Sequence, residues 1–243
     1  TDFTGRNEEG IRLHQKIIDE FPFNELAWFN LAAAYQGLKL YEKAIDAYEY
    51  AMAIDEKFDY ALRNMGDAYI RLRRYKEAVE VLEKVLELAR PEDVIYEAIG
   101  HCYDKMGNYA QARFNYRKAS HLNNDDSQLN YKIACTYMNE SNWESAVKNL
   151  EIAMRIHRLQ PEYNLAMGQC YMEMDKLDDA IRYYDKFLQS GNPGMGEATV
   201  KEANYNMGYC YLRKENFIVA QGFFQKAVGK IALNSAPIDQ DAY

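Results

Sequence analysis

The 243-residue chain has little of what marks several common classes of protein. It holds only five prolines, and none of its apolar runs approaches the roughly 18 residues that a membrane-spanning helix needs, so we expect a soluble protein without a membrane span. Basic residues are outnumbered, 29 against 37 acidic ones, which leaves a net charge of -8. Because binding to phosphate backbones requires a positive face, we expect no nucleic-acid partner.

Cysteine and histidine are scattered, and their spacing excludes the usual metal and redox motifs. The cysteines are Cys102, Cys135, Cys170 and Cys210. They form no C-x-x-C pair, so neither a zinc site nor a dithiol site is predicted, and we interpret them as small buried helix residues. Unpaired thiols are typical of a reducing compartment, so we expect a cytoplasmic location. The four histidines show neither H-x-x-x-H nor H-E-x-x-H spacing, so we expect no metal.

Two further segments resemble ligand-binding loops only in part. The glycine-rich segment 191–196 lacks the Lys and Ser or Thr that complete a phosphate-binding loop, so we interpret it as a turn. The acidic segment Asn123–Asp126 lacks the central Gly and closing Glu of a calcium loop. We expect Asp126 or Ser127 to cap the next helix instead. The sequence therefore predicts no cofactor and no enzymatic activity.

What the sequence does contain is an internal repeat. A shift of 34 residues aligns five units, and a sixth aligns after six further residues are allowed. One column holds small residues: Ala32, Gly66, Gly100, Ala134, Gly168 and Gly208. Three residues later a second column is entirely tyrosine: Tyr35, Tyr69, Tyr103, Tyr137, Tyr171 and Tyr211. Nine residues after each tyrosine stands an alanine: Ala44, Ala78, Ala112, Ala146, Ala180 and Ala220. Chance does not produce this agreement, so every unit predicts the same local structure.

The spacing within a unit predicts two helices. In the first unit the apolar positions 28, 31, 32 and 35 follow the helical period, and positions 41, 44, 45 and 48 repeat it after a break at 38–40. So short a link makes the two helices antiparallel. The small residues allow close approach, and a column of large residues fills the space around it: Tyr48, Leu82, Tyr116, Leu150, Tyr184 and Phe224. This packing must offset the roughly 1 kcal/mol that a glycine costs inside a helix.

These columns resemble the tetratricopeptide repeat, a helix-turn-helix unit of 34 residues. The resemblance covers Glu25–Asn234 and implies an all-α solenoid of stacked antiparallel helix pairs, wound as a right-handed superhelix. We predict six repeats, at 25–58, 59–92, 93–126, 127–160, 161–194 and 201–234, with an insertion at 195–200. A partial repeat, its second helix only, precedes them at 1–24, and a disordered tail follows at 235–243. In the later units the first large residue becomes Asn130, Asn164 or Asn204, which we interpret as altered packing between units.

The insertion and the C-terminal end carry separate expectations. The insertion is either a tolerated longer loop or an added lip on a binding surface, and from Glu197 onward it should extend the following helix by more than a turn. No polar capping helix follows the last repeat, so Phe223, Val228 and Ile231 would meet only solvent or a partner. We therefore expect this uncapped helix either to self-associate or to dock to a missing segment. The chain begins with Thr1 and half a repeat, so we expect it to be a piece of something longer.

The resemblance implies that the first helices line the inner, concave side, where peptides bind. The candidate partner-binding residues occupy the non-core positions of these helices: Phe29, Arg63, Asp67, Glu97, His101, Tyr131, Met138, Leu165, Gln169, Met172, Tyr205 and Tyr209. The early units offer charge, and the later ones offer Tyr, Met and Leu. One hypothesis is that the later units hold apolar or aromatic side chains of a partner while the charged units fix its direction. The alternative is that these residues pack within a tightly wound solenoid.

The predicted function is a noncatalytic protein–protein interaction scaffold that binds a peptide or extended partner segment in the concave groove. Two alternatives stay open: a regulatory or sensor module cut from a larger multidomain protein, and an enzyme built on helical repeats. The family's receptors for chaperone tails hold a terminal carboxylate with Lys, Asn and Arg side chains. The matching positions here carry Phe29, Ala33, Asn64 and Ala98. Only Asn64 agrees, so that class of partner is disfavoured.

Overall fold

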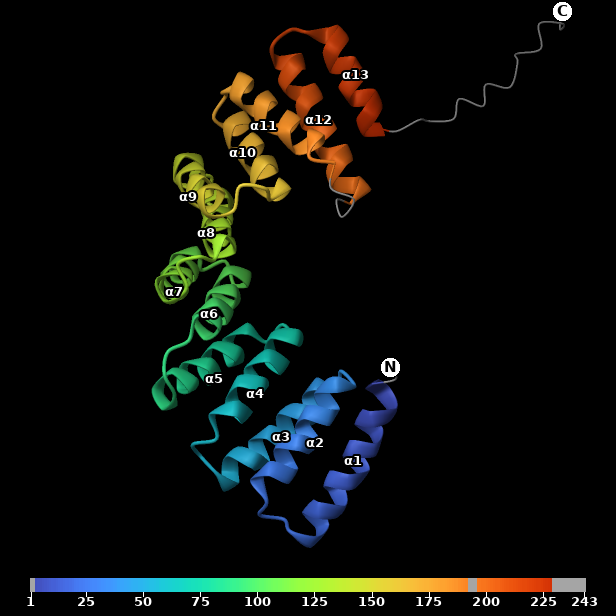
Figure 1. Ribbon diagram of the computed structural model, residues 1–243, viewed down its shortest axis with the longest axis vertical. Coiled ribbons are helices and arrows are strands. Elements are labelled where there is room, and N and C mark those ends of the chain that lie inside the picture. The colour runs from blue at the N-terminus through green and yellow to red at the C-terminus, as the bar shows by residue number, and fades with distance from the viewer. Residues whose placement is uncertain (1–2, 192–195, 229–243) are drawn as a thin grey trace, which may run out of the picture. The chain divides into compact units, whose positions relative to one another are not determined.

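The computed structural model describes residues 3–191 and 196–228, and across these ranges it contains α-helices and no β-strand (Figure 1). The helices are α1 (Phe3–Glu20), α2 (Glu25–Gly37), α3 (Tyr41–Ile54), α4 (Asp59–Arg71), α5 (Tyr75–Leu88), α6 (Asp93–Lys105), α7 (Tyr109–Leu122), α8 (Ser127–Asn139), α9 (Trp143–Ile156), α10 (Pro161–Glu173), α11 (Leu177–Gln189), α12 (Glu197–Arg213) and α13 (Phe217–Val228). The predicted all-α fold is confirmed. None of the described helices combines the length and the apolar character needed to cross a membrane.

The chain forms two compact units, Thr1–Thr136 and Tyr137–Tyr243, and each is built from stacked helix pairs. In the first unit α2 packs against α3, α4 against α5, and α6 against α7; in the second, α10 packs against α11 and α12 against α13. Successive pairs are joined because α3 also contacts α4, α5 contacts α6, α9 contacts α10 and α11 contacts α12. The predicted solenoid of antiparallel helix pairs is therefore confirmed (Figure 1).

The turn inside each pair is closed by one backbone hydrogen bond that the repeat preserves. In all six turns the carbonyl at the tyrosine position accepts the N–H of the residue five positions later, at 2.9 Å. The residue before that donor has a positive φ: Lys39, Arg73, Gly107, Ser141, Asp175 and Glu215, with φ between 56° and 75°. Left-handed backbone conformations of this kind terminate helices and are easiest for glycine. Only one of the six turns uses glycine, so the other five carry a local conformational cost.

The glycines of the small-residue column lie tightly against the second helix of their pair, as the sequence predicted. A Cβ added at any of four glycines would lie 2.7–2.8 Å from a side chain of the following helix. The pairs are Gly66 with Leu82, Gly100 with Tyr116, Gly168 with Tyr184, and Gly208 with Phe224. No ordinary Cβ contact is this short, so at these four positions an alanine would force the facing side chain to shift.

Buried cysteines in the core stay protonated, whereas a buried asparagine donates a hydrogen bond to the backbone. Cys102, Cys170 and Cys210 are fully buried, which confirms their interpretation as small core residues, while Cys135 is partly buried. Burial raises the pKa of Cys102 to about 12 and that of Cys210 to about 11, so these thiols stay protonated. Asn204 is also buried, and its side chain donates to the carbonyl of Val200 one turn earlier at 2.8 Å.

The predicted helix extension is confirmed, because α12 begins at Glu197 and has 17 residues, compared with 13 in α10. An ion pair between Lys201 and Glu197, at 2.7 Å, lies in the added turn. The expected cap at the acidic segment is also present, since Asp126 accepts the N–H of Gln128 at 2.8 Å. Residues 192–195, which belong to the expected turn and insertion, lie outside the described residues.

One expectation about the C-terminal helix is wrong. Phe223 does not face only solvent or a partner, because its ring stacks on Tyr211 of α12 at a centroid distance of 5.5 Å. The same contact joins Tyr183 to Tyr171 in the preceding pair, so Phe223 occupies a position that packs within its own repeat. Val228 is exposed as expected. Ile231 and the predicted tail at 235–243 lie outside the described residues.

Candidate functional site

The charged candidates of the first unit are bound to neighbouring helices. The guanidinium of Arg63 on α4 donates twice to the Glu92 carboxylate just before α6, at 2.9 and 3.0 Å. It also donates to Asp59 at 3.2 Å. The Arg63 side chain is only 19% exposed, and its pairing with Glu92 raises the pKa of Arg63. Glu92 is a partner that sequence reasoning missed, because it lies 29 positions after Arg63, at the opposite end of the same repeat.

Asp67 and Glu97 are paired in a similar way. Asp67 on α4 accepts a hydrogen bond from Gln36 of α2 at 2.8 Å, and Gln36 in turn accepts one from the Tyr48 hydroxyl of α3 at 2.9 Å. Glu97 on α6 forms an ion pair with Lys132 of α8. These bonds connect successive first helices. A partner that used the same side chains would therefore have to compete with contacts that already exist within the chain.

The two ring candidates of the first unit are partly covered. Phe29 on α2 lies against Tyr48 and Phe58, with ring centroids at 5.7 and 5.0 Å. His101 on α6 meets the edge of the Tyr75 ring at 6.3 Å. Burial, followed by the positive charges of Lys105 and Lys132, lowers the pKa of His101. The imidazole is therefore neutral near pH 7 and adds no charge to this face.

The candidates of the second unit are more exposed and more apolar. Tyr205 is 56% exposed and Tyr209 40% exposed, and both lie on α12 together with the equally exposed Leu212. Their spacing places the three side chains on one face of the helix. We call Tyr205, Tyr209 and Leu212 the α12 surface. The Tyr205 ring also contacts Phe224 at 5.5 Å, and the Arg213 guanidinium lies 5.9 Å from the Tyr209 ring centre.

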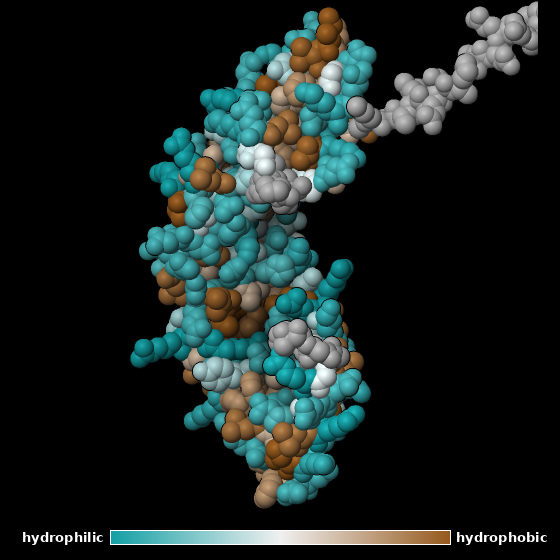
Figure 2. Space-filling view, turned by 45° about the vertical axis from the view of Figure 1, so that its right-hand side comes forward, coloured by the Kyte–Doolittle hydropathy of each residue, from teal (hydrophilic) through white to brown (hydrophobic). Residues whose placement is uncertain are grey.

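The remaining candidates lie on α8 and α10. Gln169 on α10 is exposed, whereas Leu165 and Met172 on the same helix are partly buried. Helix α10 contacts α12, so Leu165, Gln169 and Met172 lie on a helix that is adjacent to the one carrying the α12 surface. Tyr131 and Met138, on α8, are both partly buried. On the face shown in Figure 2, hydrophobic side chains are interspersed with hydrophilic ones.

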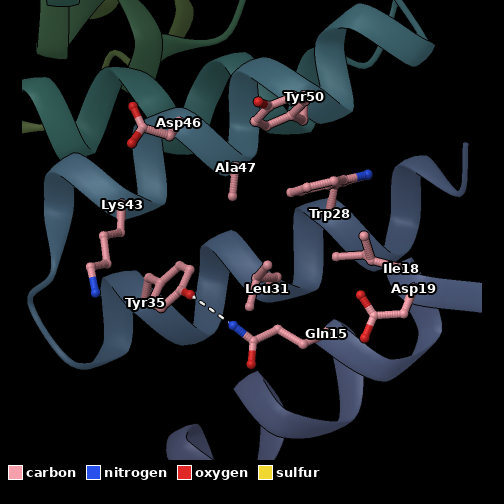
Figure 3. Close-up of a pocket in the computed structure, with 10 residues that line it drawn as sticks. All are labelled: Gln15, Ile18, Asp19, Trp28, Leu31, Tyr35, Lys43, Asp46, Ala47 and Tyr50. Atoms are coloured by element: carbon pink, nitrogen blue, oxygen red, sulfur yellow. Dashed lines mark hydrogen bonds between the residues drawn. The ribbon is translucent and has the colours of Figure 1, made fainter. Parts of the chain in front are cut away.

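The structure also contains a pocket that sequence reasoning missed. It has a volume of about 320 Å³ and lies among α1, α2 and α3 (Figure 3). The Trp28 ring stacks on Tyr50 at 4.4 Å at one end, and at the other Gln15 donates to the Tyr35 hydroxyl at 3.3 Å. The sequence assigned Trp28 and Tyr35 to the core, and only the packing of three helices shows that they also border an open space.

The arrangement provides surface side chains that can contact a partner. No group of three His, Cys, Asp or Glu side chains among the described residues could hold a metal ion. The α12 surface offers aromatic rings with hydroxyl groups, which combine apolar contact area with hydrogen bonding and are frequent in protein interfaces. The first unit offers polar side chains whose bonds are mostly satisfied.

Comparison with known proteins agrees with this architecture. The family described as the tetratricopeptide repeat protein 21 C-terminal ARM domain matches residues 28–166, and a tetratricopeptide repeat family matches residues 163–190. No curated protein sequence gives a significant match.

Solved structures show the same fold at low sequence identity. The C-terminal part of a TPR repeat-containing protein from Cytophaga hutchinsonii has a TM-score of 0.81 at 16% identity, over 98% of this chain and 95% of that one. YrrB, described as a TPR protein with an unusual peptide-binding site, has a TM-score of 0.63 at 20% identity, over 75% of this chain and 94% of that one. The APC/C hetero-tetramer Cut9-Hcn1 has a TM-score of 0.58 at 14% identity, over 92% and 43%.

These structures establish likeness of fold alone, whereas the ARM-domain family covers more than half of the sequence. The chain therefore belongs to the tetratricopeptide-repeat proteins, in the family of the tetratricopeptide repeat protein 21 C-terminal ARM domain.

Proposed function

We propose that this protein is a noncatalytic scaffold that binds a peptide or an extended segment of another protein along its first helices. Membership of the tetratricopeptide-repeat proteins supports a role in protein interaction. Among the proteins of similar fold, YrrB is described as having a peptide-binding site, and Cut9 and Hcn1 form a hetero-tetramer.

The observation that carries the proposal is the exposed α12 surface. Tyr205, Tyr209 and Leu212 leave large apolar areas open to solvent on one helix face. Burying a large apolar side chain is worth roughly 1.5 to 3 kcal/mol, and tyrosines are frequent among the residues that dominate binding energy. The proposed partner segment therefore presents apolar or aromatic side chains to this surface, and Gln169 and Met172 on α10 extend it.

The polar residues of the first unit have a secondary role in this proposal. Arg63, Asp67 and Glu97 hold the first helices together through the pairs described above. A partner backbone that reaches them would exchange hydrogen bonds with groups already in place, which contributes direction and specificity more than affinity. Phe29, His101 and Tyr131 complete the proposed binding face of the first compact unit, and Met138 and Leu165 complete that of the second.

The test is the double variant Tyr205→Ala/Tyr209→Ala in the full chain. Partners are captured by cross-linking in cell extract and identified by mass spectrometry, and affinity for the captured partner is then measured. We expect at least about a tenfold loss of affinity, with an unchanged thermal unfolding curve. Tyr60→Ala is the matched control, because Tyr60 is a 64% exposed tyrosine on another first helix.

Two outcomes would count against the proposal. Equal affinity of the double variant and the wild type would exclude the α12 surface as the binding site. If the double variant unfolds, the pair Tyr205→Gln and Tyr209→Gln is measured, and normal binding by that pair would favour the alternative in which these residues only pack within the solenoid.

We also propose self-association through α13. Ile218 is 87% exposed and Val228 is 61% exposed on this terminal helix. A single terminal helix with exposed apolar residues can bury them against a second copy. Light scattering over a range of concentrations should show a mass that rises above that of the monomer, and Ile218→Asp should prevent the rise. A monomer mass at every concentration would exclude this interface.

The repeat boundaries and the cellular location complete the proposal. The first helices begin at residues 25, 59, 93, 127, 161 and 197, which supports the six proposed repeats and the insertion before the last. The four cysteines form no disulfide, which supports a cytoplasmic location that cell fractionation would test. A regulatory module of a larger protein would use the same surface, and finding further domains in the same gene product would distinguish that role from a free scaffold.

A further inference from the structure

The tyrosine column of the repeat contains one ring, that of Tyr103, which no other aromatic or cationic side chain covers among the described residues. The tyrosine column lies between successive second helices, and most of its rings are covered by another side chain of the same chain. Tyr171 stacks on Tyr183 and Tyr211 stacks on Phe223, each at 5.5 Å. Tyr69 is covered by a cation instead, because the guanidinium of Arg74 lies 4.7 Å from its ring centre.

Arg74 occupies a complete binding site for a guanidinium group. Its Nε donates to Glu77 at 2.9 Å and its Nη1 donates to Glu42 at 3.2 Å, while its planar head lies over the Tyr69 ring. Pairing with Glu77 raises the pKa of Arg74, which keeps it charged. The site combines a ring face with carboxylates from α3 and α5, and an arginine matches such a site better than a lysine does.

One repeat later the arginine is missing. The residue 34 positions after Arg74 is Asn108, whose short side chain caps α7 by accepting the N–H of Gln111 at 3.3 Å. Within the described part of the chain, no ring or cation lies over Tyr103, the counterpart of Tyr69. A cavity of about 460 Å³ is present there instead, between α5 and the end of α6. Its lining consists of Lys76, Val79, Glu80, Glu83, Tyr103, Met106 and Asn108.

The lining suits a long side chain with a positive end. Val79 is buried and Met106 partly buried, so together with the Tyr103 ring they provide apolar contacts for methylene groups. Glu80 and Glu83 are exposed, and neither forms an ion pair among the described residues. Two glutamates and one lysine leave a surplus of one negative charge in the lining. Burial and then the charge of Glu83 raise the pKa of Tyr103, and Glu49, which lies 34 residues earlier, has the same effect on Tyr69.

We propose that this cavity, the Tyr103 pocket, binds an arginine side chain presented by a partner protein. The guanidinium lies over the Tyr103 ring and binds the carboxylates of Glu80 and Glu83, and the methylene groups lie against Val79 and Met106. The contact of guanidinium and ring follows the chain's own Arg74 on Tyr69. The carboxylates differ, because the counterparts of Glu42 and Glu77 are Lys76 and Gln111, and Glu80 and Glu83 of the lining take their place. The site is separate from the α12 surface, so it adds a second contact to the proposed scaffold and is tested independently.

The experiment is an NMR titration of the full chain with N-acetyl-arginine N-methylamide. We expect a saturable shift of the Tyr103 ring signals with a dissociation constant in the millimolar range, as is usual for one exposed side chain. The citrulline analogue has nearly the same shape without the charge and should bind at least about tenfold more weakly. Equal binding of the two compounds, or no shift of Tyr103, would overturn the proposal.

Two substitutions test whether an arginine covers the tyrosine ring: one adds an arginine beside Tyr103, and the other removes the arginine beside Tyr69. Neither removes a carboxylate of the pocket. Asn108→Arg should place an arginine over Tyr103, as Arg74 is placed over Tyr69, and weaken binding of the probe by at least about tenfold. Arg74→Asn should uncover Tyr69 and produce a second saturable shift there. Asn108→Ala is the control, since it removes the same helix cap without filling the pocket and should bind the probe as the wild type does. Normal probe binding by Asn108→Arg would contradict the assignment of the pocket.

Discussion

Four glycines in the first helices each lie against a large side chain of the following helix, and their effect can be measured at single residues. A Cβ at position 168 would lie 2.7 Å from the ring of Tyr184, which is fully buried and cannot move aside. We expect Gly168→Ala to lower the free energy of unfolding by about 1–3 kcal/mol, because it overpacks a filled core. Urea unfolding of the full chain would measure the change.

Gly222 is the matched control for this substitution. It lies inside α13, and a Cβ there would have no neighbour within 4 Å. Gly222→Ala should therefore stabilise the protein by roughly 0.5–1 kcal/mol, the ordinary difference between glycine and alanine in a helix. If both substitutions changed stability in the same direction, close helix approach would not be the reason for glycine at position 168.

His101 should make folding stability depend on pH in a defined window. Burial, with Lys105 and Lys132 nearby, lowers its pKa in the folded protein below the ordinary value of about 6.5. As the pH falls through that ordinary value, the unfolded chain therefore binds more protons than the folded chain. Stability should be fully present above it and decrease below it, toward the lowered pKa. His101→Gln should flatten this decrease in denaturant unfolding measured between about pH 7 and 5.

The carboxylates provide a separate check on that window. Backbone and arginine hydrogen bonds lower the pKa of Glu77, and pairing with Arg63 lowers that of Glu92. Their contributions to stability are lost only in more acidic solution, below the ordinary glutamate value of about 4.3. A pH profile of His101→Gln that keeps the wild-type slope between pH 7 and 5 would show that another group controls this range.

At the scale of the element, a non-glycine residue in the left-handed position of a turn destabilises the helix pair, and a substitution can remove this conformational strain. Lys39 adopts a φ of 61°, whereas the corresponding position in the third pair is Gly107 with a φ of 75°. A left-handed conformation costs a non-glycine residue about 1–2 kcal/mol, and glycine loses part of this advantage through its greater unfolded-state entropy. Lys39→Gly should stabilise the protein by about 0.5–1 kcal/mol in thermal or urea unfolding.

The reverse substitution tests the same reasoning. Gly107→Ala should destabilise the protein by about 1 kcal/mol, although a Cβ at this position would touch nothing within 4 Å. The loss would therefore come from the backbone and not from crowding. A neutral effect of both substitutions would mean that the left-handed position contributes nothing to helix termination.

At the scale of the whole molecule, stability should be lowest in the terminal helices. Helix α1 packs chiefly against α2, and α13 chiefly against α12, whereas α4 and α11 each contact both the preceding and the following helix. In a repeat protein each element is stabilised mainly by its neighbours, and among the described helices α1 and α13 each pack chiefly against one neighbour, whereas the inner helices have two. Amide hydrogen exchange should be at least about tenfold faster in α1 and α13 than in the inner helices. Uniform protection within each unit would contradict this nearest-neighbour behaviour.

The repeat pattern by itself predicted the helix pairs and the residues that join them. The columns around Gly100, Tyr103 and Ala112 follow the helical period, and helical period and residue size are local properties that any unit shows without its neighbours. For the same reason the exposure of Tyr205 and Tyr209 could be predicted: they fall between the apolar positions of their own helix.

The tertiary structure decided what the charged and aromatic side chains contact on other parts of the chain. Arg63 forms hydrogen bonds with Glu92, and the Phe223 ring stacks on Tyr211 and does not face solvent alone. The pockets beside Trp28 and Tyr103 exist only where several helices leave space between them. The physical reason is distance along the chain: such contacts join residues from separate helices, so they depend on how the helices pack, and a single period in the sequence contains no information about that packing.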